Sequence, residues 1–197
     1  MYSEKKSKYL KILDSAVKVF AESGVENSTV SKIASRAGVA DGTIYLYFKN
    51  KDDILTQFAN DRGVKILEKF ESEVEKGHNA REKLYNLFVS HLKEFSENVE
   101  LAAVFQAEIS RFHSVQPQIM ALSSRYRAII EKILIIGVKE NFVRSDVDVG
   151  FIKNAAAGAV NEVINSELVR KGSLSIEDRA LKLVDFVFKG VGDPACF

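Results

Sequence analysis

The chain has 197 residues, of which 46% are hydrophobic and 28% are charged, a composition typical of a soluble globular protein. No apolar run approaches the roughly 18 residues that a membrane helix needs. The start, MYSEKKSKYLKIL, is charged and has no following apolar core, so we expect neither a membrane association nor a secretory signal. The single cysteine, Cys196, cannot form an intramolecular disulfide, which agrees with a cytoplasmic location.

The formal net charge of +1 conceals an asymmetry along the chain. Residues 1–51 contain nine Lys or Arg and five Asp or Glu, a balance of +4. Residues 52–197 contain 19 basic and 22 acidic residues, a balance of −3. Statistical scatter can produce such a difference. However, the positive excess coincides with the helical motif described below, as attraction to phosphate groups would require.

The pattern predicts an all-α fold, because only two prolines occur and no stretch alternates in the manner of a strand. About nine helices are expected, in chain order over residues 7–22, 30–37, 40–48, 50–77, 79 to beyond 95, 99–110, 117–141, 147–171 and 175–189. Three of them open on a polar cap followed three residues later by an acid: Asn50 and Asp53, Asn79 and Glu82, and Ser175 and Asp178. The asymmetry of charge and motif predicts a DNA-binding domain over 1–50 and an effector-binding and dimerisation domain over 51–197.

Residues 28–51, STVSKIASRAGVADGTIYLYFKNK, contain two short helical patterns that meet at a glycine. Ser28 is the expected N-cap of the first helix. Val30, Ile33, Ala34 and Ala37 then recur at i, i+3, i+4 and i+7, which makes one apolar face. Gly38 is expected to end this helix in a left-handed conformation.

In the second pattern only Ile44 and Phe48 are expected to point inward. The residues left facing outward are polar, aromatic or glycine: Asp41, Gly42, Thr43, Tyr45 and Tyr47. Two helices joined by a turn of about four residues form a helix-turn-helix, whose second helix enters the major groove of DNA.

These residues resemble the DNA-binding signature of the TetR family of bacterial repressors, and the resemblance extends over about Ile12 to Leu55. The run Val39–Leu55 is especially similar to the acyl-CoA-responsive branch that represses fatty-acid degradation. Two positions depart from the family pattern. Ala40 stands where Ser or Thr usually caps the recognition helix, and Asp41 stands where a basic residue is frequent. The departures indicate that the operator differs from those of better-known relatives. They also argue against a phosphate contact at position 41.

The resemblance implies that Gly42, Thr43 and Tyr45 approach base edges, with Gly42 allowing close approach of the backbone. The candidate phosphate contacts are Ser28, Thr29, Lys32, Arg36, Tyr47, Lys49 and Lys51. The alternative for the two tyrosines is packing against the first helix.

The last two expected helices carry more apolar surface than a monomer usually exposes. A two-fold four-helix contact between two copies, in the region of Ala155, Val184 and Phe188, would bury it. The resemblance implies the same homodimer. The alternative is a helix that is buried on both sides within one subunit.

An effector pocket is expected in the C-terminal region. The candidate lining combines phenylalanines, basic groups for the phosphates of an acyl-CoA, and part of a polar stripe of asparagines: Phe70, Phe88, Phe95, Phe105, Arg111, Arg125, Asn154 and Asn161. The alternatives are a phenylalanine-rich core and a solvated basic loop.

Catalytic and metal sites find no support in the sequence. It contains no phosphate-binding glycine loop, no GxSxG motif and no cysteine near an activating partner. The Glu75–His78 pair lacks the second copy that a di-iron bundle needs, and His91 and His113 are expected on the surface or lining a pocket. We therefore expect a protein that is not an enzyme and needs no cofactor.

The sequence thus predicts a homodimeric repressor of fatty-acid degradation genes. It would bind a near-palindromic double-stranded operator and be released by a long-chain fatty acyl-CoA. One alternative is a TetR-type repressor of efflux or other genes that responds to a different hydrophobic ligand. The other is a helical lipid carrier that does not bind DNA.

Overall fold

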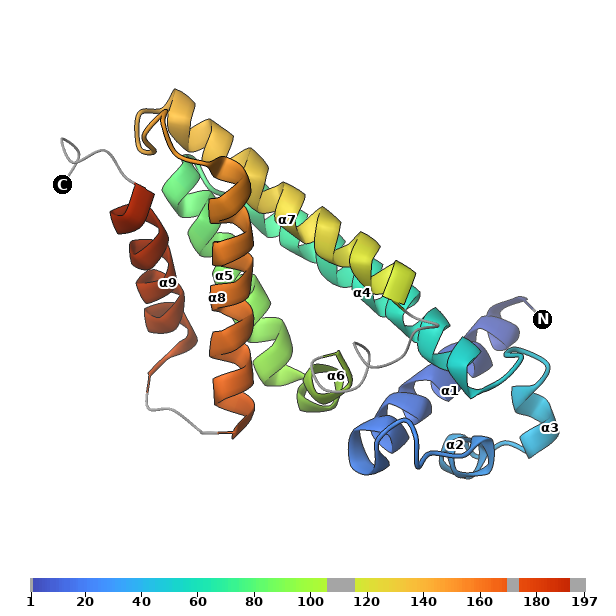
Figure 1. Ribbon diagram of the computed structural model, residues 1–197. Helices are drawn as coiled ribbons and strands as arrows, with labels where there is room; N and C mark the ends of the chain where they lie inside the picture. Colours follow the sequence, from blue (N-terminus) through green and yellow to red (C-terminus); the bar gives the residue numbers. More distant parts are fainter. Residues whose placement is uncertain (1, 106–115, 170–173, 192–197) are drawn as a thin grey trace. The chain divides into compact units, whose positions relative to one another are not determined.

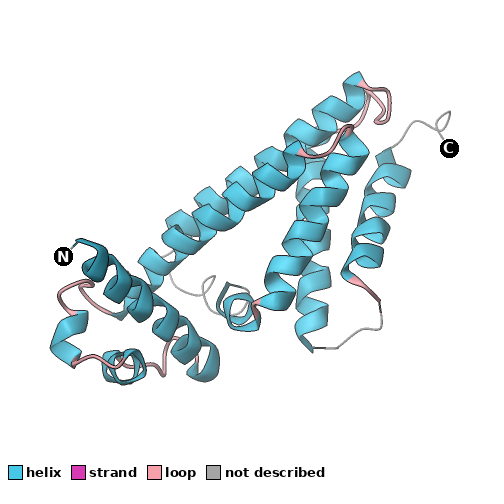
Figure 2. Ribbon diagram, turned by 180° about the vertical axis from the view of Figure 1, so that it is seen from behind, coloured by secondary structure: helices cyan, strands magenta, loops and turns pink. Residues whose placement is uncertain are grey.

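The computed structural model describes residues 2–105, 116–169 and 174–191. Within these ranges all regular structure is helical, as Figures 1 and 2 show, and the expected all-α fold is confirmed. The helices are α1 (Tyr2–Ser23), α2 (Val30–Ala37), α3 (Asp41–Ile44), α4 (Lys51–Glu75), α5 (Ala80–Glu97), α6 (Val99–Ala103), α7 (Gln116–Lys139), α8 (Val149–Val169) and α9 (Ile176–Val191). None of the helices in the described ranges combines the length and the apolar character that a membrane crossing requires.

Packing divides the chain into two compact units. Unit 1 consists of Met1–Val64 and Asn98–Met120, and unit 2 of Lys65–Glu97 and Ala121–Phe197. Helices α4 and α7 each contribute residues to both units. The functional boundary expected after residue 50 stays a prediction, because it concerns what the two parts bind.

Unit 1 is built on the apolar face of α1, which packs against α2, while α2 packs against α3. Its core side chains are almost completely buried: Ile12, Ala16, Phe20, Ile33, Ala37, Ile44, Phe48, Ile54 and Leu55. Burying each of the larger ones contributes about 1.5–3 kcal/mol. The helical periodicity of the sequence therefore fixes which faces of α2 and α3 remain outside.

Unit 2 is organised around α5, which packs against both α8 and α9. Leu84, Leu87 and Phe88 of α5 are fully buried. On α9 the buried residues include Val184 and Phe188, and the guanidinium of Arg81 lies over the Phe188 ring at 5.8 Å from its centroid. The inner face of α9 is therefore part of the core of the subunit itself.

The predicted caps of α4, α5 and α9 are confirmed by hydrogen bonds. The Asn50 side chain accepts from Asp53 N at 2.8 Å, and the Asp53 carboxylate accepts from Lys49 N. The same arrangement recurs where Asn79 and Glu82 start α5. At the start of α9 the Ser175 hydroxyl accepts from Asp178 N and donates to the Asp178 carboxylate. Each pair satisfies N–H groups that the first turn leaves unbonded.

Two local predictions are wrong. Thr29, not Ser28, is the N-cap of α2, because its side chain accepts from Lys32 N at 3.2 Å. Helix α3 ends at Ile44 rather than near residue 48, since Leu46 N and Tyr47 N bond three residues back and continue the chain as tight turns. The left-handed Gly38 at the end of α2 is as predicted, with φ of 64°.

Candidate functional site

The α3 outer face consists of Asp41, Gly42, Tyr45 and Leu46, all exposed. Tyr45 is 58% exposed and Leu46 is 76% exposed, unusual values for large side chains with so much apolar surface. Leu46 was not among the contacts predicted from the sequence. The signal was available, because position 46 falls between the inward positions 44 and 48.

The outer face is held in place from beneath by buried aromatic packing. The Tyr9 ring of α1 stacks on Phe48 with centroids 5.2 Å apart. Burial, reinforced by the neighbouring Asp61 carboxylate, raises the pKa of Tyr9 to about 12. Tyr9 thus links α1 to the segment that follows α3, a role that the sequence analysis did not assign.

Gly42 has no reason within the subunit to be glycine. A Cβ built on it would meet nothing within 4 Å, and its φ is not in the left-handed region. Glycine in a helix costs about 0.5–1 kcal/mol relative to alanine. The bare backbone at this position therefore suits an approaching partner rather than the fold.

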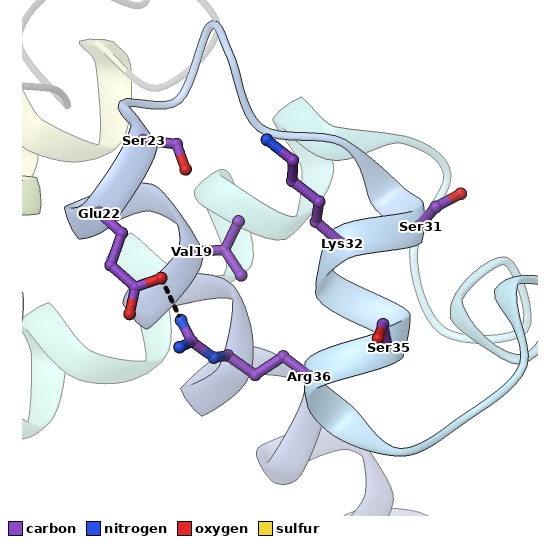
Figure 3. Close-up of a pocket in the computed structure, with 7 residues that line it drawn as sticks. All are labelled: Val19, Glu22, Ser23, Ser31, Lys32, Ser35 and Arg36. Carbon is purple, nitrogen blue, oxygen red and sulfur yellow. Dashed lines mark ion pairs between the residues drawn. The ribbon is translucent and has the colours of Figure 1, made fainter.

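An open hollow of about 630 Å³ lies between the end of α1 and α2 (Figure 3). It is lined by Val19, Glu22, Ser23, Ser31, Lys32, Ser35 and Arg36. Hydroxyl, ammonium and guanidinium groups of this kind bind phosphate oxygens. Figure 3 shows Arg36 directed toward Glu22, with Nη1 and Oε2 2.7 Å apart. The hydrogen bond from Arg36 holds the pKa of Glu22 below its usual range, so a phosphate would compete with a carboxylate for Arg36.

Lys51 lies at the start of α4 with its ammonium directed at the turn between α1 and α2. Its Nζ donates to the carbonyl oxygens of Val25 at 2.6 Å, Glu26 at 3.0 Å and Ser28 at 3.0 Å. An ammonium has three N–H donors, and three carbonyls accept here. In this structure Lys51 therefore fastens α4 to the α1–α2 turn.

The remaining candidate DNA contacts differ in accessibility. Ser28 is 3% exposed and its hydroxyl donates to the Gly24 carbonyl at 2.6 Å, so it holds the turn rather than facing outward. Thr29 and Lys49 are exposed. Thr43 and Tyr47 are half-buried.

Unit 2 contains a buried polar pair inside an aromatic cluster. His91 Nδ1 and the Tyr126 hydroxyl are 2.8 Å apart, and the Phe70 and Phe95 rings each lie 5.1 Å from the imidazole. Burial lowers the pKa of His91 to about 3 and raises that of Tyr126. His91 was expected on the surface or lining a pocket, and the surface position is wrong, because the side chain is only 6% exposed. Its position four residues after Leu87, on the apolar stripe of α5, was the available signal.

The structure brings together only part of the predicted effector set. Phe70, Phe88 and Phe95 are buried in unit 2. Phe105 belongs to unit 1, where its ring lies 5.5 Å from that of Phe58. Arg111 and His113 lie outside the described residues.

Two further effector candidates already have partners. Arg125 makes two hydrogen bonds with Glu71, 2.9 Å from Nε to Oε1 and 2.6 Å from Nη2 to Oε2. Both side chains are partly exposed, so the pair remains accessible to a competing anion. Asn154 is exposed and donates to the Gly150 carbonyl at 2.9 Å, and Asn161 is half-buried.

The predicted dimer seam needs a correction. Val184 is fully buried and Phe188 is 2% exposed within the single subunit, so neither side chain is available to a second copy. Ala155 is exposed. The large apolar side chains that the described parts of α8 and α9 expose include Phe151, at 66%, Phe186, at 64%, and Leu181, at 46%. The sequence could not distinguish the two faces of α9, because both are apolar.

Comparison with known families divides the chain at nearly the same place as its charge. Residues 12–58 match the family described as bacterial regulatory proteins, tetR family, and residues 59–190 match the family described as YsiA-like protein, C-terminal region. The fatty acid metabolism regulator protein of Bacillus subtilis (strain 168) is 31% identical over 189 residues, which is 95% of this chain and 97% of that protein.

Two solved structures are similar over nearly the whole chain. FadR from Bacillus subtilis, a transcriptional regulator in complex with stearoyl-CoA, gives a TM-score of 0.84 at 31% identity and covers 93% of this chain and 99% of its own. The fatty acid degradation regulator FadR from Bacillus halodurans gives a TM-score of 0.85 at 29% identity, covering 93% and 95%. The chain is thus similar in both sequence and architecture to the same group of regulators.

Proposed function

Because the chain belongs to the TetR family of bacterial regulatory proteins, we propose that it acts in the cytoplasm as a homodimeric repressor of fatty-acid degradation genes. It binds a near-palindromic double-stranded operator and leaves it when a long-chain fatty acyl-CoA binds. The observation that carries the effector assignment is the similarity, over nearly the whole chain, to a regulator bound to stearoyl-CoA.

DNA binding would place the α3 outer face in the major groove, one copy from each subunit. Gly42 lets the backbone come close, and Thr43 and Tyr45 lie where base edges would be. The exposed Thr29, Lys32, Arg36 and Lys49 would bind phosphates on either side. Tyr47 is half-buried and can pack with its ring while its hydroxyl bonds to phosphate.

Dimerisation would bury the exposed side of α8 and α9. Phe151 and Phe186 are the anchors that we propose, with Ala155 and Gly158 allowing close approach of the helices. A Cβ on Gly158 would meet nothing within 4 Å, so its glycine, like Gly42, has no packing reason within the subunit. Replacing Gly158 by Leu should therefore weaken the dimer in sedimentation measurements without unfolding the subunit.

The acyl chain would lie among the buried phenylalanines of unit 2, Phe70, Phe88 and Phe95, and Arg125 would bind phosphate groups of the CoA. Binding can release DNA only if the effector prefers a conformation that fits the operator poorly. Helix α4 is a suitable lever, because it runs from unit 1 into unit 2 and Lys51 fastens its start to the α1–α2 turn.

The test measures release of a selected operator by acyl-CoAs of about 8 to 18 carbons. Fluorescence anisotropy of the operator reports its release, and free CoA is the control. Each buried methylene contributes about 0.8 kcal/mol, so affinity should rise steeply with chain length. Flat affinity across the series, or release by another hydrophobic compound alone, would remove the acyl-CoA assignment. Failure to bind any DNA would instead favour the lipid-carrier alternative.

A paired substitution tests the head-group site. Arg125→Ala should weaken acyl-CoA binding, whereas Glu71→Gln should strengthen it by removing the competing carboxylate. Arg81→Ala is the matched control, because Arg81 is a similarly exposed arginine paired with Asp185 in the same unit. Equal effects of the Arg81 and Arg125 substitutions would argue against a specific phosphate contact.

A further inference from the structure

The α3 outer face lacks the side chains that most often specify bases. Arg or Lys bonded to guanine is the commonest specific contact, and Asn or Gln commonly bonds adenine. None of these four residue types occurs among Asp41, Gly42, Tyr45 and Leu46. The charged group on this face is a carboxylate, which can only accept hydrogen bonds.

The carboxylate of Asp41 is oriented by the neighbouring helix. Its Oδ2 accepts a hydrogen bond from the Ser31 hydroxyl of α2. Among the described residues Oδ1 has no hydrogen-bond partner. Asp41 is exposed, and Gly42 beside it projects no side chain. One acceptor oxygen is therefore fixed and open to a partner.

Within the fold, Asp41 accepts one exposed hydrogen bond, from Ser31, and a neutral acceptor such as the amide oxygen of Asn could accept it as well. Asp41 makes no cap hydrogen bond, and the N-cap of α3, Ala40, has none from its side chain either. A carboxylate in the first turn of a helix is modestly stabilised by the helix dipole, but this helix has only four residues. Near DNA the same carboxylate would be repelled by phosphates.

We infer that Asp41 is a specificity-determining residue that accepts a hydrogen bond from the N4 amino group of a cytosine in each half of the operator. This inference rests on the proposed DNA binding. Guanine presents only acceptors in the major groove, and thymine presents an acceptor and a methyl group. Adenine carries the N7 acceptor beside its amino group, and this N7 would face the carboxylate without a hydrogen atom between them. Cytosine is therefore the base whose edge matches a carboxylate acceptor. Leu46, on the same face, would contact the methyl group of a nearby thymine.

The test begins with selection of operators from a random double-stranded library by the full-length protein. The expected result is a cytosine fixed at symmetric positions in the two half-sites. Replacing this cytosine by thymine should weaken binding of the unsubstituted protein about tenfold. For Asp41→Asn the same replacement should cost less than about threefold, and selection should favour adenine, which an asparagine can bond through both N6 and N7.

Two further variants separate orientation from charge. Ser31→Ala keeps the charge of Asp41 but removes the hydrogen bond that orients it, so it should give an intermediate loss of discrimination. Glu26→Gln removes one negative charge from an exposed site of the same unit and should leave base preference unchanged. Thermal unfolding followed by circular dichroism checks that each variant is folded.

The outcomes are distinguishable. If Asp41→Asn selects the same operator, or tightens binding to all DNA equally, Asp41 does not select a base and the inference is overturned. If the unsubstituted protein enriches no sequence at all, the proposed DNA binding is overturned instead.

Discussion

The glycines in the interior of unit 2 and the glycine on the α3 outer face differ in the space around them. A Cβ on Gly137 would lie 2.7 Å from Val143 Cγ2 and 3.2 Å from Ala80 Cβ. One on Gly77 would lie 2.6 Å from the backbone nitrogen of Lys83. One on Gly42 would meet nothing within 4 Å. The interior thus excludes larger side chains by its own packing, whereas the outer face does not.

The same difference holds for polar groups. In unit 2 the buried His91 is bonded to Tyr126, as a buried polar side chain requires. On α3 the exposed Asp41 and Leu46 are not required by packing. Packing and hydrogen bonding thus explain these residues in the interior of unit 2, whereas the packing of the subunit does not explain the residues of the α3 outer face.

The largest expected effect comes from the two faces of α9. Val184→Asp places an unpaired charge in the core and should destabilise the subunit by about 3–5 kcal/mol, enough to unfold it. Phe186→Asp should leave the subunit folded and dissociate the dimer. Circular dichroism and light scattering measure the two results. A folded Val184→Asp protein would contradict the assignment of this face to the core.

Lys51 belongs to unit 1, which carries the candidate DNA contacts, but its ammonium group bonds to backbone carbonyls of the same unit. Lys51→Ala leaves three backbone carbonyls without their charged donor and should cost about 2–3 kcal/mol of unfolding free energy. Lys49→Ala, at an exposed site nearby, should leave stability unchanged and instead reduce the salt dependence of DNA binding by about one unit. Denaturant unfolding and a salt titration measure these effects. A reduced salt slope for Lys51→Ala without loss of stability would make Lys51 a phosphate contact.

Gly137→Ala should destabilise the protein by about 1–3 kcal/mol, because the new methyl group overlaps Val143. Gly158→Ala, at an open position of α8, is the matched control. It should not destabilise the subunit, since alanine is the better helix former. Both are measured by urea unfolding of the subunit.

His91 makes the stability of unit 2 depend on pH. Its folded pKa, about 3, lies below the unfolded value near 6.5, so the unfolded state binds a proton that the folded state does not. Stability should therefore fall as the pH falls through 6.5 toward 3, by about 1–2 kcal/mol between pH 7 and pH 5. His91→Gln should remove this part of the dependence. Identical pH profiles for both proteins would show that His91 is not buried.

A small gain in stability is expected at Gly42. Gly42→Ala should raise the unfolding free energy by up to about 1 kcal/mol, because it relieves the cost of a helical glycine without any contact. Operator affinity should fall, since the methyl group lies where the backbone would approach DNA. Unchanged operator affinity would mean that DNA does not come close at this position.

The amino-acid sequence by itself determined the all-helical fold and the caps of α4, α5 and α9. Periodicity placed Ile44 and Phe48 inside, and both are buried. Asn50 and Asn79 opened α4 and α5 as predicted, because a cap and its acid lie three residues apart and act locally. The helix-turn-helix and its family followed from one continuous segment for the same reason.

Only the tertiary structure decided which apolar faces are shared with other parts of the subunit. Val184 and Phe188 are on an apolar side of α9, but packing against α5, distant in sequence, makes that side interior and leaves Phe186 outside. Local patterns likewise could not predict the hydrogen bonds of Lys51 and His91, because their partners lie 23 to 35 residues away. Local rules fix the periodicity of a helix, whereas long-range contacts fix what each face meets.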